Sequence, residues 1–254
     1  MKVSIVVPNY NHGKYLTACL DSIKMQLYKN YEVFIYDNCS KDNSIEVAQD
    51  YVKKNPKFKL ITSKTHSHSA AKNIDDAIRN YATGEVCTWL NADDRFKELY
   101  LTKILPYFTS PDVGFVRIGI TANFEDTGEI VVFGPSVWNN IPDIVLQNKV
   151  YPSSPFRREL FLECGGMDEK ARFWDWDFWV RCGLSCASDQ WTYATCNLPL
   201  IVRRIHGPEC WEDEIAHVQN GQPFGNDSKQ CGADYIMGKY IKGNKLVCDY
   251  SRRL

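Results

Sequence analysis

The segment Asn91-Ala92-Asp93-Asp94 is the part of this 254-residue sequence best placed to do chemistry, because it follows directly on the apolar run Val86–Leu90. Two adjacent carboxylates at the end of a buried strand repel each other and resist removal from water. A divalent cation would relieve that repulsion, since Mg²⁺ and Mn²⁺ prefer oxygen ligands and bridge carboxylates to phosphate oxygens. The simpler alternative is a strand-end turn that caps a helix over residues 96–105.

Two other polar junctions follow apolar runs in the first half of the chain. Pro8-Asn9-Tyr10-Asn11 follows residues 3–7, and Asp37-Asn38 follows residues 31–36, where plain turn chemistry is the alternative. Ligands of open α/β sheets bind outside the carboxyl ends of the strands, so we expect these junctions to meet the paired carboxylates. The sequence has no Gly-x-Gly-x-x-Gly after the first strand and no Gly-x-x-x-x-Gly-Lys-[Ser/Thr], which are the two common phosphate-binding loops. Carboxylates and a metal would therefore have to hold a diphosphate.

Hydrophobic periodicity predicts the elements that must position these residues. Continuous apolar runs predict strands, and apolar residues at helical spacing predict helices between them. Their alternation predicts an α/β domain with a largely parallel sheet covered by helices. After residue 110 the pattern loosens, although further strands and an aromatic helix are expected. The strands are expected at residues 3–7, 31–36, 58–61, 86–90, 113–120, 130–133 and 198–205, and the helices at 15–27, 40–52, 70–81 and from 174.

Composition narrows the class of protein. The net charge of −1 gives no argument for nucleic acid as a partner. No window approaches the roughly 18 apolar residues of a membrane span. The N-terminal apolar run stops at Pro8, which predicts a strand and not a signal peptide, so we expect a cytoplasmic chain.

The ten cysteines are scattered without Cys-x-x-Cys spacing, and reduced thiols are expected in the absence of a secretion signal. Irregular spacing also disfavours a structural zinc site. One set that could be assembled for zinc consists of Cys182, Cys186, Cys196, Cys210 and His206.

Five ordered segments over roughly residues 3–206 resemble the family 2 glycosyltransferases. The resemblance implies the GT-A fold, which has a Rossmann-like, mostly parallel central sheet with flanking helices and a smaller acceptor-side region. It implies one domain over 1–206, with a nucleotide-sugar-binding half (1–110) and an acceptor-side half (111–206), followed by an extension (207–254). The segments are SIVVPNYNHGKYLTACLDSI (4–23), YEVFIYDNCSKDNS (31–44), AAKNIDDAIRNYATGEVCTWLNADD (70–94), GGMDE (165–169) and WDWDFWVR (174–181).

The activity that this resemblance implies is sugar transfer with inversion from a nucleotide-sugar, often a UDP-sugar, with Mn²⁺ or Mg²⁺ as cofactor. The acceptor would be a hydroxyl of a saccharide or a lipid-linked glycan, in surface polysaccharide or glycan synthesis. In the nucleotide site, Pro8 and Tyr10 would form the wall of the nucleobase pocket, and Asp37 would accept a hydrogen bond from uracil. Asn38 replaces the second Asp of that motif, and Lys72 would approach the base or the diphosphate as a point charge.

The resemblance also assigns the metal site. Asp93 would contact the ribose or assist at the metal, and Asp94 would ligate it. Asn91 stands where the family often has a third Asp and is not counted as a ligand. His206 follows the last expected strand, where many members carry a histidine that completes the site. A structural role is the alternative for His206.

Inverting transfer needs a carboxylate that takes the proton of the acceptor hydroxyl. The family's Glu-Asp motif aligns with Trp174-Asp175, so Asp175 is the expected base. Asp177 is the fallback, because the change at Trp174 leaves the register uncertain. Packed aromatic residues would raise the pKa of such a carboxyl towards a useful value. In the alternative interpretation, both aspartates cap an aromatic core helix.

Two other functions compete with sugar transfer. A nucleotidyltransferase of the nucleotide-sugar pyrophosphorylase kind would need a glycine-rich loop with Arg or Lys after the first strand, whereas PNYNHGKY has one Gly and no Arg. A catalytically silent nucleotide-sugar-binding domain is disfavoured by the intact aspartates. In the extension, residues 207–228 could form a lid or an inert loop. Residues 229–254 carry six Lys/Arg against two Asp, which could favour peripheral contact with an anionic membrane or simply form a solvated tail.

Overall fold

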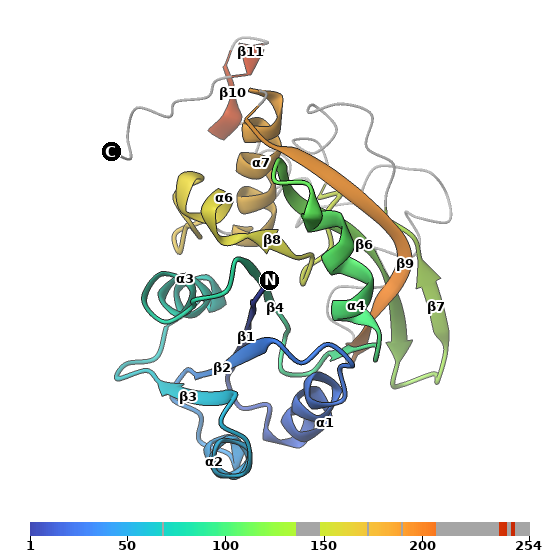
Figure 1. Ribbon diagram of the computed structural model, residues 1–254. Coiled ribbons are helices and arrows are strands. Elements are labelled where there is room, and N and C mark those ends of the chain that lie inside the picture. Colours follow the sequence, from blue (N-terminus) through green and yellow to red (C-terminus); the bar gives the residue numbers. More distant parts are fainter. Residues whose placement is uncertain are drawn as a thin grey trace.

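The computed structural model describes residues 1–67, 69–135, 148–171, 173–188, 190–206, 239–242 and 245–246 (Figure 1). Its centre is one mixed sheet with the strand order β3-β2-β1-β4-β8-β6-β9-β5, and β7 pairs with β6. A separate short hairpin, β10-β11, lies near the C-terminus. The strands are β1 (Val3–Asn9), β2 (Tyr31–Asp37), β3 (Phe58–Thr62), β4 (Val86–Trp89), β5 (Arg95–Phe96), β6 (Val113–Phe124), β7 (Ile130–Phe133), β8 (Phe156–Arg157), β9 (Thr192–Ile205), β10 (Ile241–Lys242) and β11 (Lys245–Leu246).

The first four strands are parallel, as the alternating pattern predicts, and every residue of β1, β2 and β4 is buried. Burial on both faces explains their continuous apolar sequences. Helices α1 and α2 pack on one face and α3 on the other, together with α6 and α7. The helices are α1 (Gly13–Lys24), α2 (Ser44–Lys54), α3 (Ala70–Asn80), α4 (Tyr100–Ile104), the 3₁₀ helix η1 (Leu105–Thr109), α6 (Arg158–Glu163) and α7 (Trp174–Ala187).

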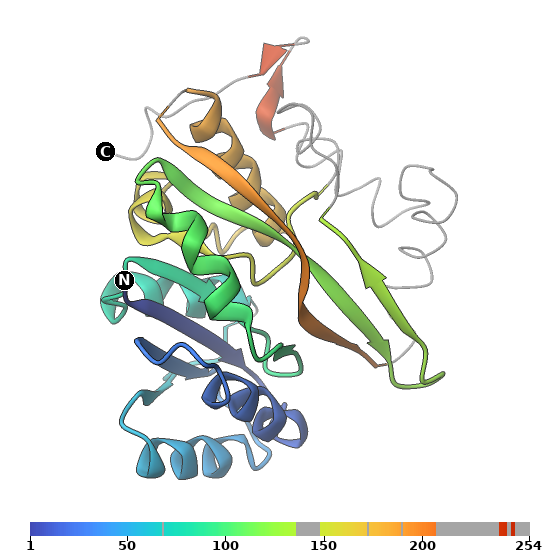
Figure 2. The ribbon, with the colours of Figure 1, turned by 45° about the vertical axis from the view of Figure 1, so that its right-hand side comes forward.

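The second half of the sheet is built on two long strands, β6 and β9, which run parallel and side by side in Figure 2. β9 begins at Thr192, six residues before the apolar run that predicts it, because its first residues alternate in polarity and lack such a run. Near its other end, β9 pairs with β5, which places Arg95 opposite Val202. This pairing joins the segment after Asp93-Asp94 to the end of β9.

Helix α1 ends at Lys24, three residues earlier than its apolar spacing predicts. Leu27 is 56% exposed, whereas the neighbouring Gln26 is fully buried. The Gln26 side chain donates to the carbonyl of Lys97 at 2.8 Å and accepts from the amide of Leu101 at 3.0 Å. These two bonds turn the chain inward after the helix and fix α1 against α4.

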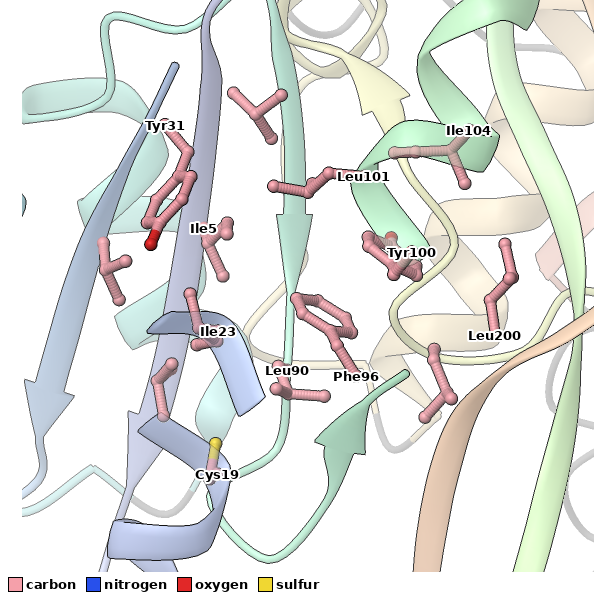
Figure 3. Packing of buried hydrophobic residues seen from close by; sticks show 14 of the residues in the cluster. Ile5, Cys19, Ile23, Tyr31, Leu90, Phe96, Tyr100, Leu101, Ile104 and Leu200 are labelled. Atoms are coloured by element: carbon pink, nitrogen blue, oxygen red, sulfur yellow. The ribbon is translucent and has the colours of Figure 1, made fainter. Parts of the chain in front are cut away.

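The core on the α1 side continues across the sheet to β9 without a break (Figure 3). Phe96 and Tyr100 stack with ring centroids 3.9 Å apart, between Leu90 and Leu200. Stacked rings of this kind bury a large apolar area in a defined geometry. The stack fixes β5 and the start of α4, which follow Asp93-Asp94 in the chain, against the core.

No helix in the described part of the chain is long and apolar enough to cross a membrane. The seven cysteines within the described ranges are free thiols. Cys210 of the zinc alternative, the whole of the 207–228 segment and most of the 229–254 tail lie outside the described residues.

Glu32 is a buried carboxylate on β2 that sequence patterning does not reveal. It accepts hydrogen bonds from Ser4, from the amide and hydroxyl of Thr83, and from the ammonium groups of Lys2 at 2.9 Å and Lys59 at 3.2 Å. Burial alone would raise the pKa of Glu32, but these bonds lower it to about 2. The cluster ties β1, β2, β3 and the α3–β4 turn together.

We expect Glu32→Gln to lower the free energy of unfolding by about 2 kcal/mol at pH 7, as for other charged hydrogen-bonded groups. The folded-state pKa lies below the unfolded value, so the carboxylate stabilises the fold above pH 4.5, and that stabilisation is lost as the pH falls towards 2. Urea unfolding of both proteins at pH 7 and pH 2.5 measures the effect. The difference should fall to roughly a quarter of its pH 7 value at pH 2.5, where the folded-state carboxyl is still partly ionised. An equal difference at both pH values would contradict the assignment.

Candidate active site

The ends of β1 and β2 are joined by an Asn-Asp pair. Asn9 lies opposite Asp37 in the parallel register, and its amide nitrogen donates to Asp37 Oδ2 at 2.8 Å. The amide of Ser40 donates to the other Asp37 oxygen at 2.9 Å. Because a carboxylate can only accept, the contact between Asn9 and Asp37 requires the nitrogen end of the Asn9 amide to face Asp37. Asn9 Oδ1 then points away from Asp37, and this buried atom has no hydrogen-bond partner among the described residues.

A pocket of about 430 Å³ opens beside this pair at the carboxyl ends of the strands. Tyr10 stands at its wall with 41% of its surface exposed, and the His66 ring lies 4.3 Å from the Tyr10 ring. Asp37 is 1% exposed and supports the pocket from beneath without lining it. The lining residues are Pro8, Asn9, Tyr10, His12, Asn38, His66, Ser67, Ser69, Ala70, Asn73, Asn91, Ala92 and Asp93.

The pocket therefore brings together Pro8, Tyr10 and Asp93 of the predicted nucleotide-binding residues, but not Lys72. Lys72 lies on α3 and lines a second pocket of about 570 Å³, between α3 and the loop 167–170. Sequence reasoning missed His66 in the first pocket. The rule that ligands lie at strand ends also applied to the polar residues after β3, and would have found it.

Asn38, at the position where the family has a second Asp, fixes the wall that carries His66. Its side-chain oxygen accepts from the amide of Ser67 at 2.8 Å, and its nitrogen donates to the carbonyl of Ser67 at 2.6 Å. A ring nitrogen of His66 lies 3.1 Å from the carbonyl oxygen of Asn38. An amide can donate and accept at once, which a carboxylate cannot do.

Asp93 and Asp94 meet the end of β9. The imidazole Nε2 of His206 lies 3.0 Å from Asp93 Oδ2, and the amide of Arg204 donates to Asp94 Oδ1 at 3.0 Å. Asn91 donates to the other Asp94 oxygen at 3.3 Å. Asp94 is 3% exposed, and its burial, followed by the negative charge of Asp93, raises the pKa of its carboxyl to about 7.

We call Asp93, Asp94 and His206 the candidate metal corner. Aromatic residues at the start of α1 pack against it. Tyr15 stacks on His206 with ring centroids 5.0 Å apart, and His12 lies edge-on to His206 at 6.1 Å. The Arg204 guanidinium lies 4.7 Å from the Tyr15 ring centroid and also forms an ion pair with Glu125. Sequence reasoning assigned Tyr15 only to an apolar helix face, and no motif pointed to Arg204.

The donor set at this corner fits a hard divalent cation. The Asp93 carboxylate faces the His206 imidazole nitrogen, and Asp94 lies next to Asp93 in the chain. Burial, and after it the negative charge of Asp93, raises the pKa of Asp94, and a cation would offset both effects. In the described part of the chain, no cluster of three or more His, Cys, Asp or Glu is arranged to hold a metal by itself. Mg²⁺ commonly uses only one or two carboxylates and takes its other ligands from phosphate and water.

The first turn of α7 presents Asp175 and Asp177 in different environments. Asp175 is partly buried, accepts from the Asn148 amide at 3.1 Å, and has its pKa raised by burial. Asp177 is fully buried and pairs with Arg181 and Lys239. Burial raises the pKa of both Asp94 and Asp175, and the positive charge of Arg203 partly opposes the rise at each. Asp94 and Asp175 therefore both lie within electrostatic reach of Arg203.

Gly165 and Gly166 bend the chain ahead of α7, with φ angles of 79° and 72°. A Cβ atom at Gly166 would lie 2.0 Å from Asp75 Oδ1 on α3. Asp75 also accepts from the amide of Met167 at 2.9 Å. The bend therefore holds the loop 167–170 against α3.

Comparison with solved structures shows that this architecture is the GT-A fold. TarS of S. aureus in complex with UDP-GlcNAc superposes with a TM-score of 0.69 at 18% identity, over 94% of this chain and 71% of that chain. The mannosyltransferase PcManGT from Pyrobaculum calidifontis, in complex with GDP-Man and Mn²⁺, gives a TM-score of 0.63 at 18% identity, over 94% of this chain and 69% of that one. The predicted fold class is confirmed.

The sequence profile of glycosyl transferase family 2 matches residues 4–161, and the chain belongs to that family. It is 28% identical over 218 residues to an uncharacterized glycosyltransferase of Nostoc sp., covering 82% of this chain and 66% of the relative. It is 33% identical over 96 residues to the poly(ribitol-phosphate) beta-glucosyltransferase of Bacillus spizizenii, covering 37% and 15%. The chain thus spans less than two thirds of the length of each relative.

We expect Asp94→Asn to stabilise the metal-free protein by about 2 kcal/mol at pH 8 and to change little at pH 4. The folded-state pKa of about 7 lies above the ordinary value of 3.8, so the stability that the neutral carboxyl retains below pH 3.8 is lost progressively as the pH rises from there to about 7. Thermal unfolding in EDTA at both pH values measures it. Asp50→Asn, at an exposed aspartate on α2, is the matched control. Destabilisation by Asp94→Asn at pH 8 would contradict the assignment.

Proposed function

We propose that this chain is a metal-dependent, inverting glycosyltransferase that moves a sugar from a nucleotide-sugar, preferably a UDP-sugar, to a hydroxyl of a saccharide or lipid-linked acceptor. The proposal is carried by an aromatic-walled pocket and the Asp93–His206 contact at the carboxyl ends of the strands. Trp174, next to Asp175, packs against Trp89 at the end of β4. The nucleotide-sugar complexes of TarS and PcManGT support the donor class. The poly(ribitol-phosphate) glucosyltransferase supports a role in surface polysaccharide synthesis.

The nucleobase would lie in the pocket against Tyr10 and His66. Asn9 Oδ1 is a buried acceptor without a donor, and leaving such an atom unpaired is costly. An N–H group of the base, such as N3–H of uracil, would satisfy it. Asp37 would then act on the base by holding the Asn9 amide in this orientation, in addition to any bond that its own remaining lone pairs accept.

Asp93 and His206 would hold the divalent cation, and Asp94 would supply further negative charge or a direct bond. When bound, the cation would supply positive charge that stabilises the leaving diphosphate. Tyr15 and Arg204 keep His206 and Asp93 facing each other. Lys72, from the neighbouring pocket, stays the predicted cationic contact of the base or the diphosphate.

Asp175 would take the proton from the acceptor hydroxyl as that oxygen attacks the anomeric carbon from the face opposite the diphosphate. A carboxyl whose pKa is raised by burial holds an accepted proton better than an exposed one. Asp177 is a weaker candidate, because Arg181, Lys239 and Tyr240 already occupy its carboxylate.

A panel of UDP-, GDP- and dTDP-sugars tests the donor class. We expect UDP-sugars to raise the unfolding temperature by several degrees in the presence of Mn²⁺, and not in EDTA, because a ligand that binds only the folded state stabilises it. The Asp93→Asn variant, which removes one charge from the metal corner, should lose most of the shift. If no nucleotide gives a metal-dependent shift, the proposal fails.

We expect Asp175→Asn to lower the rate of sugar transfer at least about 100-fold, in the range typical of loss of a general base. The shift in unfolding temperature caused by donor and Mn²⁺ should be retained, since Asn keeps the shape of the side chain and its contact with Asn148. Asp50→Asn again serves as the control. Full transfer by Asp175→Asn to a genuine acceptor would show that another group is the base.

A further inference from the structure

A buried ionic cluster joins helix α7 to two residues from the far C-terminal part of the chain. Asp177 is fully buried, and its carboxylate accepts from Lys239 Nζ at 2.5 Å and from the Tyr240 hydroxyl at 2.7 Å. The Arg181 guanidinium lies 2.8 Å from the other Asp177 oxygen. Lys239 also bonds to Asp168 at 2.9 Å. We call these five residues the Asp177 cluster.

The Asp177 cluster is balanced in charge, with two carboxylates against an ammonium and a guanidinium. A carboxylate buried as deeply as Asp177 needs such partners, because removal of one leaves an uncompensated charge in the interior. Burial by itself would lower the pKa of Lys239, yet its bonds to Asp177 and Asp168 raise it. Lys239 is therefore held in its charged form at the point where the loop 167–170 meets α7.

The Asp177 cluster lies in the turn of α7 that also carries Asp175. Asp177 and Asp175 lie two residues apart in the first turn of the helix. Arg181 donates to the carbonyl of Gly166 at 2.6 Å and also to that of Cys164, which fixes the bend ahead of the helix. A displacement of Asp177 would therefore move the Asp175 carboxylate relative to the metal corner.

Tyr240 adds an apolar anchor to the polar contacts. It is 7% exposed and belongs to the same buried aromatic cluster as Trp176 and Trp179 of α7. Lys239, which is half-buried, and Tyr240, which is buried, therefore attach residues 239–240 to the turn of α7 between Asp177 and Arg181. The match to the family profile ends at residue 161, so neither the helix nor this segment belongs to the matched part.

We propose that Lys239 and Tyr240 are positioning residues for sugar transfer, which act through Asp177 to fix the first turn of α7 and thereby the Asp175 carboxylate. This inference rests on the proposed role of Asp175 as the base. Two residues beyond 206 would thus support catalysis by positioning, although they touch neither the candidate metal corner nor the nucleotide pocket.

Kinetics of the full chain test the proposal. For Lys239→Met, measured at least 15 °C below its own unfolding temperature, we expect kcat to fall at least tenfold while the KM for the donor changes less than twofold. The acidic limb of the pH profile of kcat should also shift, because Asp175 sits in an altered environment. Lys239→Arg should recover kcat to within threefold. Tyr240→Phe, which removes only the hydroxyl, should lower kcat about threefold.

Lys54→Met is the matched control, because Lys54 is an exposed lysine that pairs with an aspartate on the distant helix α2. It should leave kcat, KM and the pH profile unchanged. A purely structural role for Lys239 would lower the unfolding temperature without moving kcat or the pH profile well below it. Wild-type kcat and pH profile in both Lys239→Met and Tyr240→Phe would overturn the proposal.

Hydrogen exchange gives a second readout that needs no turnover. Lys239→Met should speed exchange in peptides covering residues 173–181 and 164–168, and leave peptides of α1 unchanged. Unchanged exchange at α7 would also overturn the proposal, whatever the kinetics.

If Asp175→Asn is inactive while Lys239→Met is fully active, the positioning role fails and the proposed function stands. If the wild type turns over no nucleotide-sugar, the proposed function fails and the positioning role fails with it, while exchange still shows whether Lys239 orders α7.

Discussion

The in-register parallel pairing of β1 with β2 and β4 is the constraint on which the rest of the structure depends. It brings the carboxyl ends of the strands to one edge, where Asn9 faces Asp37. Both faces of these strands are covered by helices, so the polar residues that end them, such as Asn9 and Asp37, are left at that edge. The pocket, the Asn9–Asp37 pair and the Asp93-Asp94 segment all follow from this one alignment. A slip of one residue would turn every side chain of a strand to the opposite face.

Buried carboxylates occur in this fold in two electrostatic conditions. Glu32 and Asp177 are supplied with cations and hydrogen-bond donors from the chain itself, and both bind parts of the fold together. Asp94 is buried beside another carboxylate with too few donors, and its raised pKa records that deficit. A structural carboxylate is satisfied within the protein, whereas one that remains under-compensated is suited to meet a charge brought by a ligand.

Sequence patterning predicted the parallel half of the sheet well, because long apolar runs and helical spacing depend only on local burial. The resemblance to family 2 glycosyltransferases, and not the patterning, assigned Asp93 and His206 to one site. The structure brings their side chains within 3.0 Å of each other. It could not find Tyr15 or Arg204, since their roles depend on the end of β9 reaching α1 from more than 180 positions away in the sequence. The Asp177 cluster was equally hidden, because a lysine in a basic, weakly periodic tail looks like a solvated residue until its partner is known.

The late arrival of β9 in the chain has a consequence for the order in which the protein matures on the ribosome. Tyr10, Asp37 and the strands that carry them emerge first, whereas the end of β9 and the segment that seals Asp177 emerge last. Asp93 and His206 therefore meet only after the whole of β9 has been synthesised. The long-range pairing of β5 with β9 is the contact that brings these two parts of the chain together.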